Sequence, residues 1–277
     1  MTNPARLAVA AAPADDAALV TEATRLAREL ELPQVDVDAP PDPIDLLLLV
    51  TPVGLALDAL RGPPELTGGK PFTLDLRHID TTTGPGRSLR QPLLRAVGLR
   101  KGDPHRPFVL DATAGLGEDA WLLASMGCQV LAVERHPIVA ALLREAVTRA
   151  GRERPEVPPR LRIVTADSGA LLEQLAAHET SEHAAPEVVY LDPMFPPGRK
   201  TMERKPMRLL RRLVGADEDA ARLLPLARRA AQRRVVVKRA PRAAPLSETP
   251  PVARHRGRGV RYDVYPAEAR AGDATPP

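Results

Sequence analysis

The stretch Leu110–Ala120 reads LDATAGLGEDA and joins an apolar strand to a helix through a glycine turn. Gly115 and Gly117 permit positive φ angles and let the backbone approach a ligand closely. Asp111 stands where the apolar run ends, and the helix that follows starts with two acidic residues. Because ligands of open α/β sheets bind at the carboxyl ends of the strands, the turn predicts a ligand site.

Strands and helices alternate from Phe108 onward. Runs rich in valine and leucine, such as 129–135 and 234–240, are separated by segments with apolar residues at helical spacing. Continuous apolar strands that alternate with helices are typical of a parallel sheet covered on both faces. The sequence therefore predicts an α/β fold with a doubly wound, mostly parallel sheet, to which 260–267 adds a last, antiparallel strand.

The N-terminal part follows a different pattern. A helical repeat of apolar residues covers 17–30, and the dense apolar run at 45–51 indicates a buried strand. Residues 54–60 and 72–78 alternate apolar and polar side chains as half-buried strands do, and the turn-rich segment between them predicts a hairpin or a short meander. We expect a small N-terminal α+β domain over 1–100 and a second domain over 101–277.

Composition excludes several classes of protein. The single cysteine, Cys128, excludes an internal disulfide and a multi-cysteine zinc site, and we expect no metal. No segment reaches the roughly 20 apolar residues of a membrane span. Asp15 and Asp16 interrupt the apolar N-terminal stretch, which argues against a signal peptide, so we expect a cytoplasmic protein without a membrane partner.

Charge is distributed unevenly along the chain. Residues 1–60 contain ten acidic and three basic residues, whereas 199–242 contain fifteen basic and four acidic ones. The basic segment predicts a polyanionic partner, although an arginine-rich composition with an exposed basic helix face is the alternative explanation. The predicted contacts to this polyanion are Arg199, Lys200, Arg204, Lys205, Arg208, Arg211, Arg212, Lys238 and Arg239.

Four predicted strands end in acidic residues: Asp111, Glu134, Asp167 and Asp192. In a parallel sheet these residues lie along one edge, and unpaired buried carboxylates are costly, so the pattern indicates a shared ligand. Glu134 follows Gly115 by nineteen residues, a spacing that suits an acceptor for both ribose hydroxyls of an adenosine-containing cofactor. Asp167, with Ser168 beside it, suits an acceptor for an adenine amino group.

Two cofactors compete for this site. The letters GLGEDA match the G-x-G-x-x-A pattern of NAD-binding folds, but Glu118 and Asp119 at the helix start would repel a pyrophosphate. S-adenosylmethionine has no phosphate and carries sulfonium and ammonium groups, for the latter of which Asp111 is a suitable partner. The charges therefore favour S-adenosylmethionine. An NAD-dependent oxidoreductase and a purely structural glycine turn remain alternatives.

The second motif is VVYLDPMFPP at 188–197. Asp192 and the carbonyl of Pro193 offer acceptors that favour a pyramidal exocyclic amine, which is the geometry that attack on a methyl group requires. Phe195 offers an aromatic face to an unstacked base, and the prolines restrict the backbone. A strand-ending turn with a buried phenylalanine is the alternative.

These segments together resemble a known family. The stretches 110–143, 188–196, 233–239 and 261–265 are similar to the small-subunit ribosomal RNA methyltransferase J family, over roughly residues 66–266. The resemblance implies a class I fold that uses S-adenosylmethionine to methylate guanine N2 in 16S ribosomal RNA, alone or in the small subunit. A non-catalytic RNA-binding assembly factor is the remaining alternative. The cofactor contacts implied by the family pattern are Glu118, Asp119, Glu134, Arg135, Asp167, Ser168 and Asp192.

Overall fold

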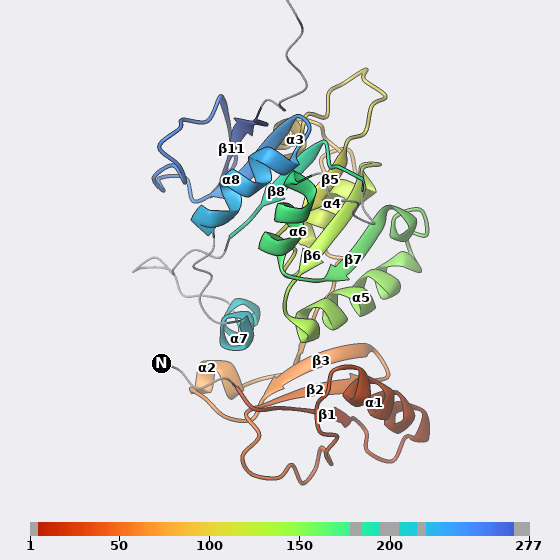
Figure 1. Cartoon of the computed structure of the whole chain (residues 1–277). Coiled ribbons are helices and arrows are strands. Elements are labelled where there is room, and N and C mark those ends of the chain that lie inside the picture. The colour runs from red at the N-terminus through yellow and green to blue at the C-terminus, as the bar shows by residue number, and fades with distance from the viewer. Residues whose placement is uncertain (1–4, 178–183, 194–204, 215–219, 269–277) are drawn as a thin grey trace, which may run out of the picture. The chain divides into compact units, whose positions relative to one another are not determined.

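The computed structural model describes residues 5–177, 184–193, 205–214 and 220–268 (Figure 1). The chain forms two compact units. Unit 1 comprises residues 1–75, 136–152 and 195–216, and unit 2 comprises 76–135, 153–194 and 217–277. The units are thus interleaved along the chain, whereas the division at residue 100 stays a prediction about the sequence.

Unit 2 is built on a seven-stranded sheet with the order β10-β11-β9-β8-β5-β6-β7. Its strands are β5 (Phe108–Asp111), β6 (Gln129–Glu134), β7 (Leu161–Thr165), β8 (Val188–Leu191), β9 (Arg234–Arg239), β10 (Ala253–Arg256) and β11 (Arg261–Pro266). Strands β5 to β9 pair in parallel, and β11 runs antiparallel between β9 and β10. The predicted doubly wound, mostly parallel sheet with an antiparallel last strand is confirmed, and β10 adds an edge strand that was not predicted.

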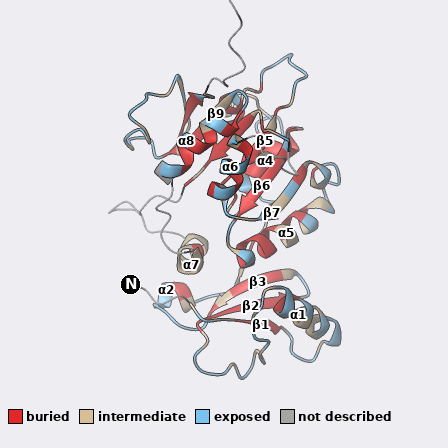
Figure 2. Cartoon of the chain, in the orientation of Figure 1, coloured by how far each residue is buried: buried red, intermediate tan, exposed pale blue. Residues whose placement is uncertain are grey.

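The helices of unit 2 are α3 (Pro92–Val97), α4 (Glu118–Ser125), α6 (Ser168–Ala176) and α8 (Ala220–Ala230), with a short 3₁₀ turn at Pro158–Arg160. Leu172 of α6 and Leu224 of α8 pack in one cluster with Val189 and Val235 of the sheet, so these two helices cover one face. Figure 2 shows the strands as the most deeply buried part of this unit. In the part of the chain that the structure describes, no helix is long and apolar enough to cross a membrane.

Unit 1 contains a four-stranded sheet with the order β1-β2-β3-β4. The strands are β1 (Leu7–Ala11), β2 (Leu46–Thr51), β3 (Gly54–Ala59) and β4 (Phe72–Thr73), and the helices are α1 (Ala17–Glu29), α2 (Pro64–Thr67), α5 (Pro137–Gly151) and α7 (Lys205–Val214). The Asp16 carboxylate caps α1 by accepting the N–H groups of Ala18 and Leu19. The predicted helix and hairpin are present, but the second strand of the hairpin is only two residues long.

The order of the large sheet reverses at β5. This strand pairs with β6 on one side and with β8 on the other. The chain thus adds β6 and β7 on one side of β5, and then continues with β8 on the other side. Such a switch point opens a crevice at the carboxyl ends of the two central strands. Asp111 ends β5 and Asp192 directly follows β8, which places both predicted site residues at this point.

Candidate functional site

Backbone N–H groups of the glycine turn donate hydrogen bonds to acidic side chains. Thr113 N donates to Asp111 Oδ1 over 3.1 Å, and Gly115 N donates to Glu134 Oε2 over 3.0 Å. Gly115 has φ 51° and Gly117 has φ 70°, as the sequence predicts for this turn. Among the described residues, a Cβ atom added at Gly115 would meet only the Thr113 carbonyl oxygen, 3.9 Å away, so these residues leave the space beside this glycine open.

The carboxyl group of Asp111 is buried at the base of the turn, with the residue only 2% exposed. Burial raises its pKa to about 8, and the hydrogen bond from Thr113 opposes that shift. The nearby charges of Asp119 and Asp192 raise the pKa further, whereas Lys238 lowers it. Asp111 is therefore protonated at neutral pH, and a cation bound beside it would favour its ionised form.

Asp119 and Asp192 share one ammonium group. Lys238 Nζ lies 2.9 Å from Asp119 Oδ2 and 2.9 Å from Asp192 Oδ2. The Tyr190 hydroxyl donates a second hydrogen bond to Asp119 Oδ2 over 2.6 Å. The sequence predicted Lys238 as an RNA contact, whereas the structure places it between the two acids. Lys238 lies on β9, the strand beside β8, and this position is the feature from which the contact with Asp192 could have been predicted.

The backbone of Asp192 is held by a hydrogen bond, and its side chain is partly exposed. Its backbone N–H donates to Thr113 Oγ1 over 2.6 Å, which ties the end of β8 to the glycine turn. Burial raises the pKa of its carboxyl group, and Lys238 counteracts this shift, while 35% of the side chain stays exposed. Pro193 is buried next to it, and Phe195 lies outside the described residues.

The third strand end reaches the same turn. Ser168 donates its hydroxyl to the carbonyl of Ala112, so the start of α6 is linked to the residue after β5. Asp167 is exposed and caps α6 by accepting the N–H of Ala170 over 2.8 Å. With the bonds from Gly115 to Glu134 and from Asp192 to Thr113, all four predicted strand ends converge on one loop.

The remaining two predicted cofactor residues lie at the surface. Arg135 follows β6 and is exposed. Glu118, the first residue of α4, is also exposed, and its carboxylate lies 3.5 Å from His78 Nε2. Both are accessible to a ligand, and the charge of Glu118 also acts on Asp192.

Three of the predicted RNA contacts on α7 bind to the N-terminal part of unit 1. Lys205 Nζ donates to the carbonyls of Gly68 and Lys70, over 2.8 Å and 3.0 Å. The other two make ion pairs, Arg208 with Glu65 at 3.9 Å and Arg212 with Asp45 at 3.4 Å. The acidic N-terminal segment and the basic helix are therefore partners within one unit, which accounts for part of the uneven charge distribution.

The other predicted RNA contacts differ in their surroundings. Arg239 is buried, 7% exposed, and its guanidinium donates to the carbonyl of Ala244, so it does not lie on the surface where an RNA contact was expected. Arg211 lies on α7 and is half-buried. Arg199, Lys200 and Arg204 lie outside the described residues.

Replacing Arg212 with methionine is expected to lower the free energy of unfolding by about 1–2 kcal/mol, between the values for exposed and buried ion pairs. The reason is that Asp45, whose side chain is only 13% exposed, loses a partner. Urea unfolding measures the change. Arg25→Met is the control, since Arg25 pairs only with exposed acids of α1 and should cost less than about 0.5 kcal/mol. Equal losses for both variants would contradict the ion-pair role.

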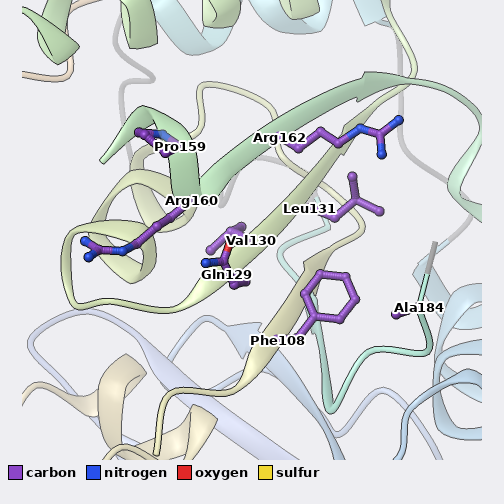
Figure 3. A pocket seen from close by; sticks show the side chains of 8 residues that line it. All are labelled: Phe108, Gln129, Val130, Leu131, Pro159, Arg160, Arg162 and Ala184. Atoms are coloured by element: carbon purple, nitrogen blue, oxygen red, sulfur yellow. The ribbon is translucent and has the colours of Figure 1, made fainter. Parts of the chain in front are cut away.

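A separate cavity of about 230 Å³ lies at the amino ends of β5, β6 and β7. Figure 3 shows Phe108, Leu131 and Arg162 on these three neighbouring strands. The other lining residues are Gln129, Val130, Pro159, Arg160 and Ala184. Because Asp111 and Asp192 lie at the carboxyl ends of the strands, the cavity belongs to the opposite edge of the sheet and is distinct from the candidate site.

Similar proteins share both the sequence and the fold of this chain. A family model described as "Putative SAM-dependent methyltransferase" matches residues 73–267, a range that contains every predicted site residue. Ribosomal RNA small subunit methyltransferase J of Coxiella burnetii is 40% identical over 253 residues, which cover 90% of this chain and 93% of that protein. Its namesake from Magnetococcus marinus is 41% identical over 250 residues, with coverages of 88% and 93%. The crystal structure of a SAM-dependent methyltransferase from Neisseria gonorrhoeae, 29% identical, matches with a TM-score of 0.65 over 96% of this chain and 98% of that chain.

Proposed function

The chain belongs to the ribosomal RNA small subunit methyltransferase J family, and from this premise we propose that it methylates the exocyclic N2 of a guanine in 16S ribosomal RNA. It is an S-adenosylmethionine-dependent methyltransferase. The alternatives of an NAD-dependent oxidoreductase and of a non-catalytic assembly factor are therefore wrong. The guanine and its N2 atom come from the family resemblance of the sequence.

The acidic groups around the glycine turn suit the charge of S-adenosylmethionine. Asp111 would hold the ammonium group, Glu134 the ribose hydroxyls, and Asp167 with Ser168 the adenine. The open side of Gly115 allows close approach to the backbone. When bound, S-adenosylmethionine supplies an electrophilic methyl group on its sulfonium sulfur.

The residues after β8 would receive the base. Asp192, with its partly exposed carboxylate, and the Pro193 carbonyl would accept hydrogen bonds from the exocyclic amine. These hydrogen bonds would hold the nitrogen lone pair toward the methyl group. Such orientation lowers the activation barrier of methyl transfer without a covalent intermediate. Phe195 would stack on the unstacked guanine, as aromatic side chains do with flipped or single-stranded bases.

A single observation carries the proposal: the ends of β5 and β8 meet at the switch point of the sheet, joined by the hydrogen bond from Asp192 N to Thr113 Oγ1. The acids proposed to bind the cofactor and the amine thereby lie next to each other, which supports methyl transfer between two ligands. A site that only bound the cofactor would not need the second group of acids.

Ribosomal RNA or the small subunit is the proposed partner. The basic residues between Arg199 and Arg212 follow the proposed catalytic corner, the segment from Asp192 to Phe195, and would contact the phosphate backbone. Lys205, Arg208 and Arg212 have partners in unit 1, and the phosphate contacts of Arg199, Lys200, Arg204 and Arg211 stay a prediction from the sequence.

Mass mapping of small-subunit ribosomal RNA from a deletion strain tests the proposed function. One N2-methylguanine should be lost, and it should return when the wild-type chain is supplied. The purified protein should also transfer labelled methyl groups from S-adenosylmethionine to small-subunit RNA or to subunits from the deletion strain. An unchanged RNA mass map, together with no transfer in vitro, would refute the proposal.

Replacing Glu134 with glutamine is expected to weaken S-adenosylhomocysteine binding by about 1–3 kcal/mol, as the loss of charged hydrogen bonds predicts. Glu134 is 7% exposed and also accepts the N–H of Gly115, so the substitution affects the ribose partner and the turn together. Isothermal titration calorimetry measures the affinity. Glu173→Gln makes the same change at an exposed position of α6 and should bind as the wild type does. Unchanged affinity of the Glu134 variant would exclude the ribose role.

A further inference from the structure

Lys238 holds the two acids of the site together, and its role goes beyond the contacts expected of a cofactor or RNA site. Its Nζ atom lies 2.9 Å from both Asp119 Oδ2 and Asp192 Oδ2. We propose that Lys238 is a positioning residue for methyl transfer, which keeps Asp192 ionised and orients its carboxylate toward the amino group of the substrate. This inference rests on the proposed function and adds a residue to its machinery.

The fold accounts for the position of this ammonium group. Val235 and Val237 of β9 pack in the core under α6 and α8, so Lys238 belongs to the alternate set of side chains, which points to the other face of the sheet. On that face it is opposite Tyr262 of β11 in register, and the Tyr262 ring lies 6.5 Å from that of Tyr190. Only 26% of the Lys238 side chain is exposed, so the ion pairs are weakly screened by solvent.

Acidic groups outnumber cations around Asp192. The groups that act on its charge are Asp111 from β5, Glu118 and Asp119 from α4, Tyr190 from β8, Tyr262 from β11 and Lys238 from β9. Burial and the charges of Asp119 and Glu118 raise the pKa of Asp192, whereas Lys238 lowers it. Without this ammonium, Asp192 would therefore take up a proton at a higher pH, and a protonated carboxyl group is a poor acceptor for an amine.

The two carboxylate oxygen atoms of Asp192 have different contacts. Lys238 binds Oδ2, and the backbone N–H of Asp192 is fixed on Thr113. In the described part of the chain, Oδ1 has no hydrogen bond and 35% of the side chain is exposed, so Oδ1 is the oxygen that we assign to the substrate amine. Tyr190 and Lys238 both donate to Asp119 Oδ2, so the ammonium is bound by Asp119 as well as by Asp192.

The test is the pH dependence of single-turnover methyl transfer to small-subunit RNA at saturating cofactor. In Lys238→Met the acidic limb of the rate profile should move up by about 1–3 pH units, the shift typical of losing an adjacent opposite charge. The rate below that limb should fall by a matching factor of about 10–10³. Lys238→Arg keeps the charge, so its limb should stay at the wild-type pH even if the rate falls.

Asp119→Asn provides the opposite change. Removing a like charge while Lys238 stays should move the acidic limb to lower pH, and the double variant Lys238→Met, Asp119→Asn should lie between the two single variants. Circular dichroism shows whether each variant is folded, because Asp119 is itself a predicted cofactor contact and cofactor titration would not separate the two effects. If Lys238→Met is less stable but keeps the wild-type limb, or if Lys238→Arg shifts the limb as Lys238→Met does, the positioning role is refuted. Absence of transfer by the wild type would instead refute the proposed function.

Discussion

Asp192→Asn should slow methyl transfer by about 10²–10⁴-fold, the range for losing an acid–base or acceptor group that acts in the transition state. Asparagine keeps the size and one oxygen of the side chain but removes the charge that pairs with Lys238. Cofactor affinity should change by less than about tenfold, since at most one hydrogen bond is altered. Single-turnover transfer to small-subunit RNA and titration with S-adenosylhomocysteine measure the two effects separately.

Asp103→Asn is the matched control. Asp103 is exposed in the loop before β5, on the amino side of that strand, whereas Asp192 follows the carboxyl end of β8. The control should keep both wild-type rate and wild-type affinity. A rate for Asp192→Asn within about threefold of the control would remove Asp192 from the chemistry, because such a change is below that of a single lost hydrogen bond.

The affinity for S-adenosylmethionine should rise with pH up to about 8, by as much as tenfold per pH unit. Burial raises the pKa of Asp111 to about 8, so the free protein holds this proton at neutral pH. A bound ammonium group favours the carboxylate, so binding releases the proton and becomes easier as pH rises through this range. Above pH 8 the carboxyl group is already ionised, but the α-amino group of the cofactor loses its own proton there, so the affinity should fall again.

Calorimetry between pH 5.5 and 7 isolates this effect, because the α-amino group of the cofactor, with a pKa of about 8, stays protonated there. Titrations in buffers of different ionisation enthalpy should show close to one proton released per cofactor bound. Asp111→Asn has no titrating group at this position, so its affinity should be nearly independent of pH below 7 and lower than that of the wild type near pH 8. A wild-type affinity that does not vary with pH would contradict the proposed contact between Asp111 and the ammonium.

The sequence predicted most of the candidate site because its elements are local. The period of the apolar residues predicts the strands, and once the strands are parallel, Asp111, Glu134, Asp167 and Asp192 must share one edge. The structure adds hydrogen bonds from three of these strand ends to the loop after β5. For Asp111 the sequence offered the residue but not its protonation state, which depends on burial by segments far apart in the chain.

The contacts of the basic residues were not predictable in the same way. Lys238 and Arg239 are neighbours in the sequence and were assigned one role, but successive side chains of a strand point to opposite faces. One therefore binds the site acids, and the other is buried beside Ala244. For α7, a dense run of arginines gives no indication of which ones face Asp45 or Glu65, because those acids come from the other end of the sequence.

The strand β11 lies inside the sheet, between β9 and β10, although it is the last strand along the described chain. During synthesis, β9 therefore has one open edge until residues 261–266 have left the ribosome. Lys238 lies on β9 opposite Tyr262, so the ammonium that joins the two acids reaches its final surroundings only then. A nascent chain without residues 261–266 therefore leaves the β9 edge unpaired, and an unpaired strand edge favours aggregation.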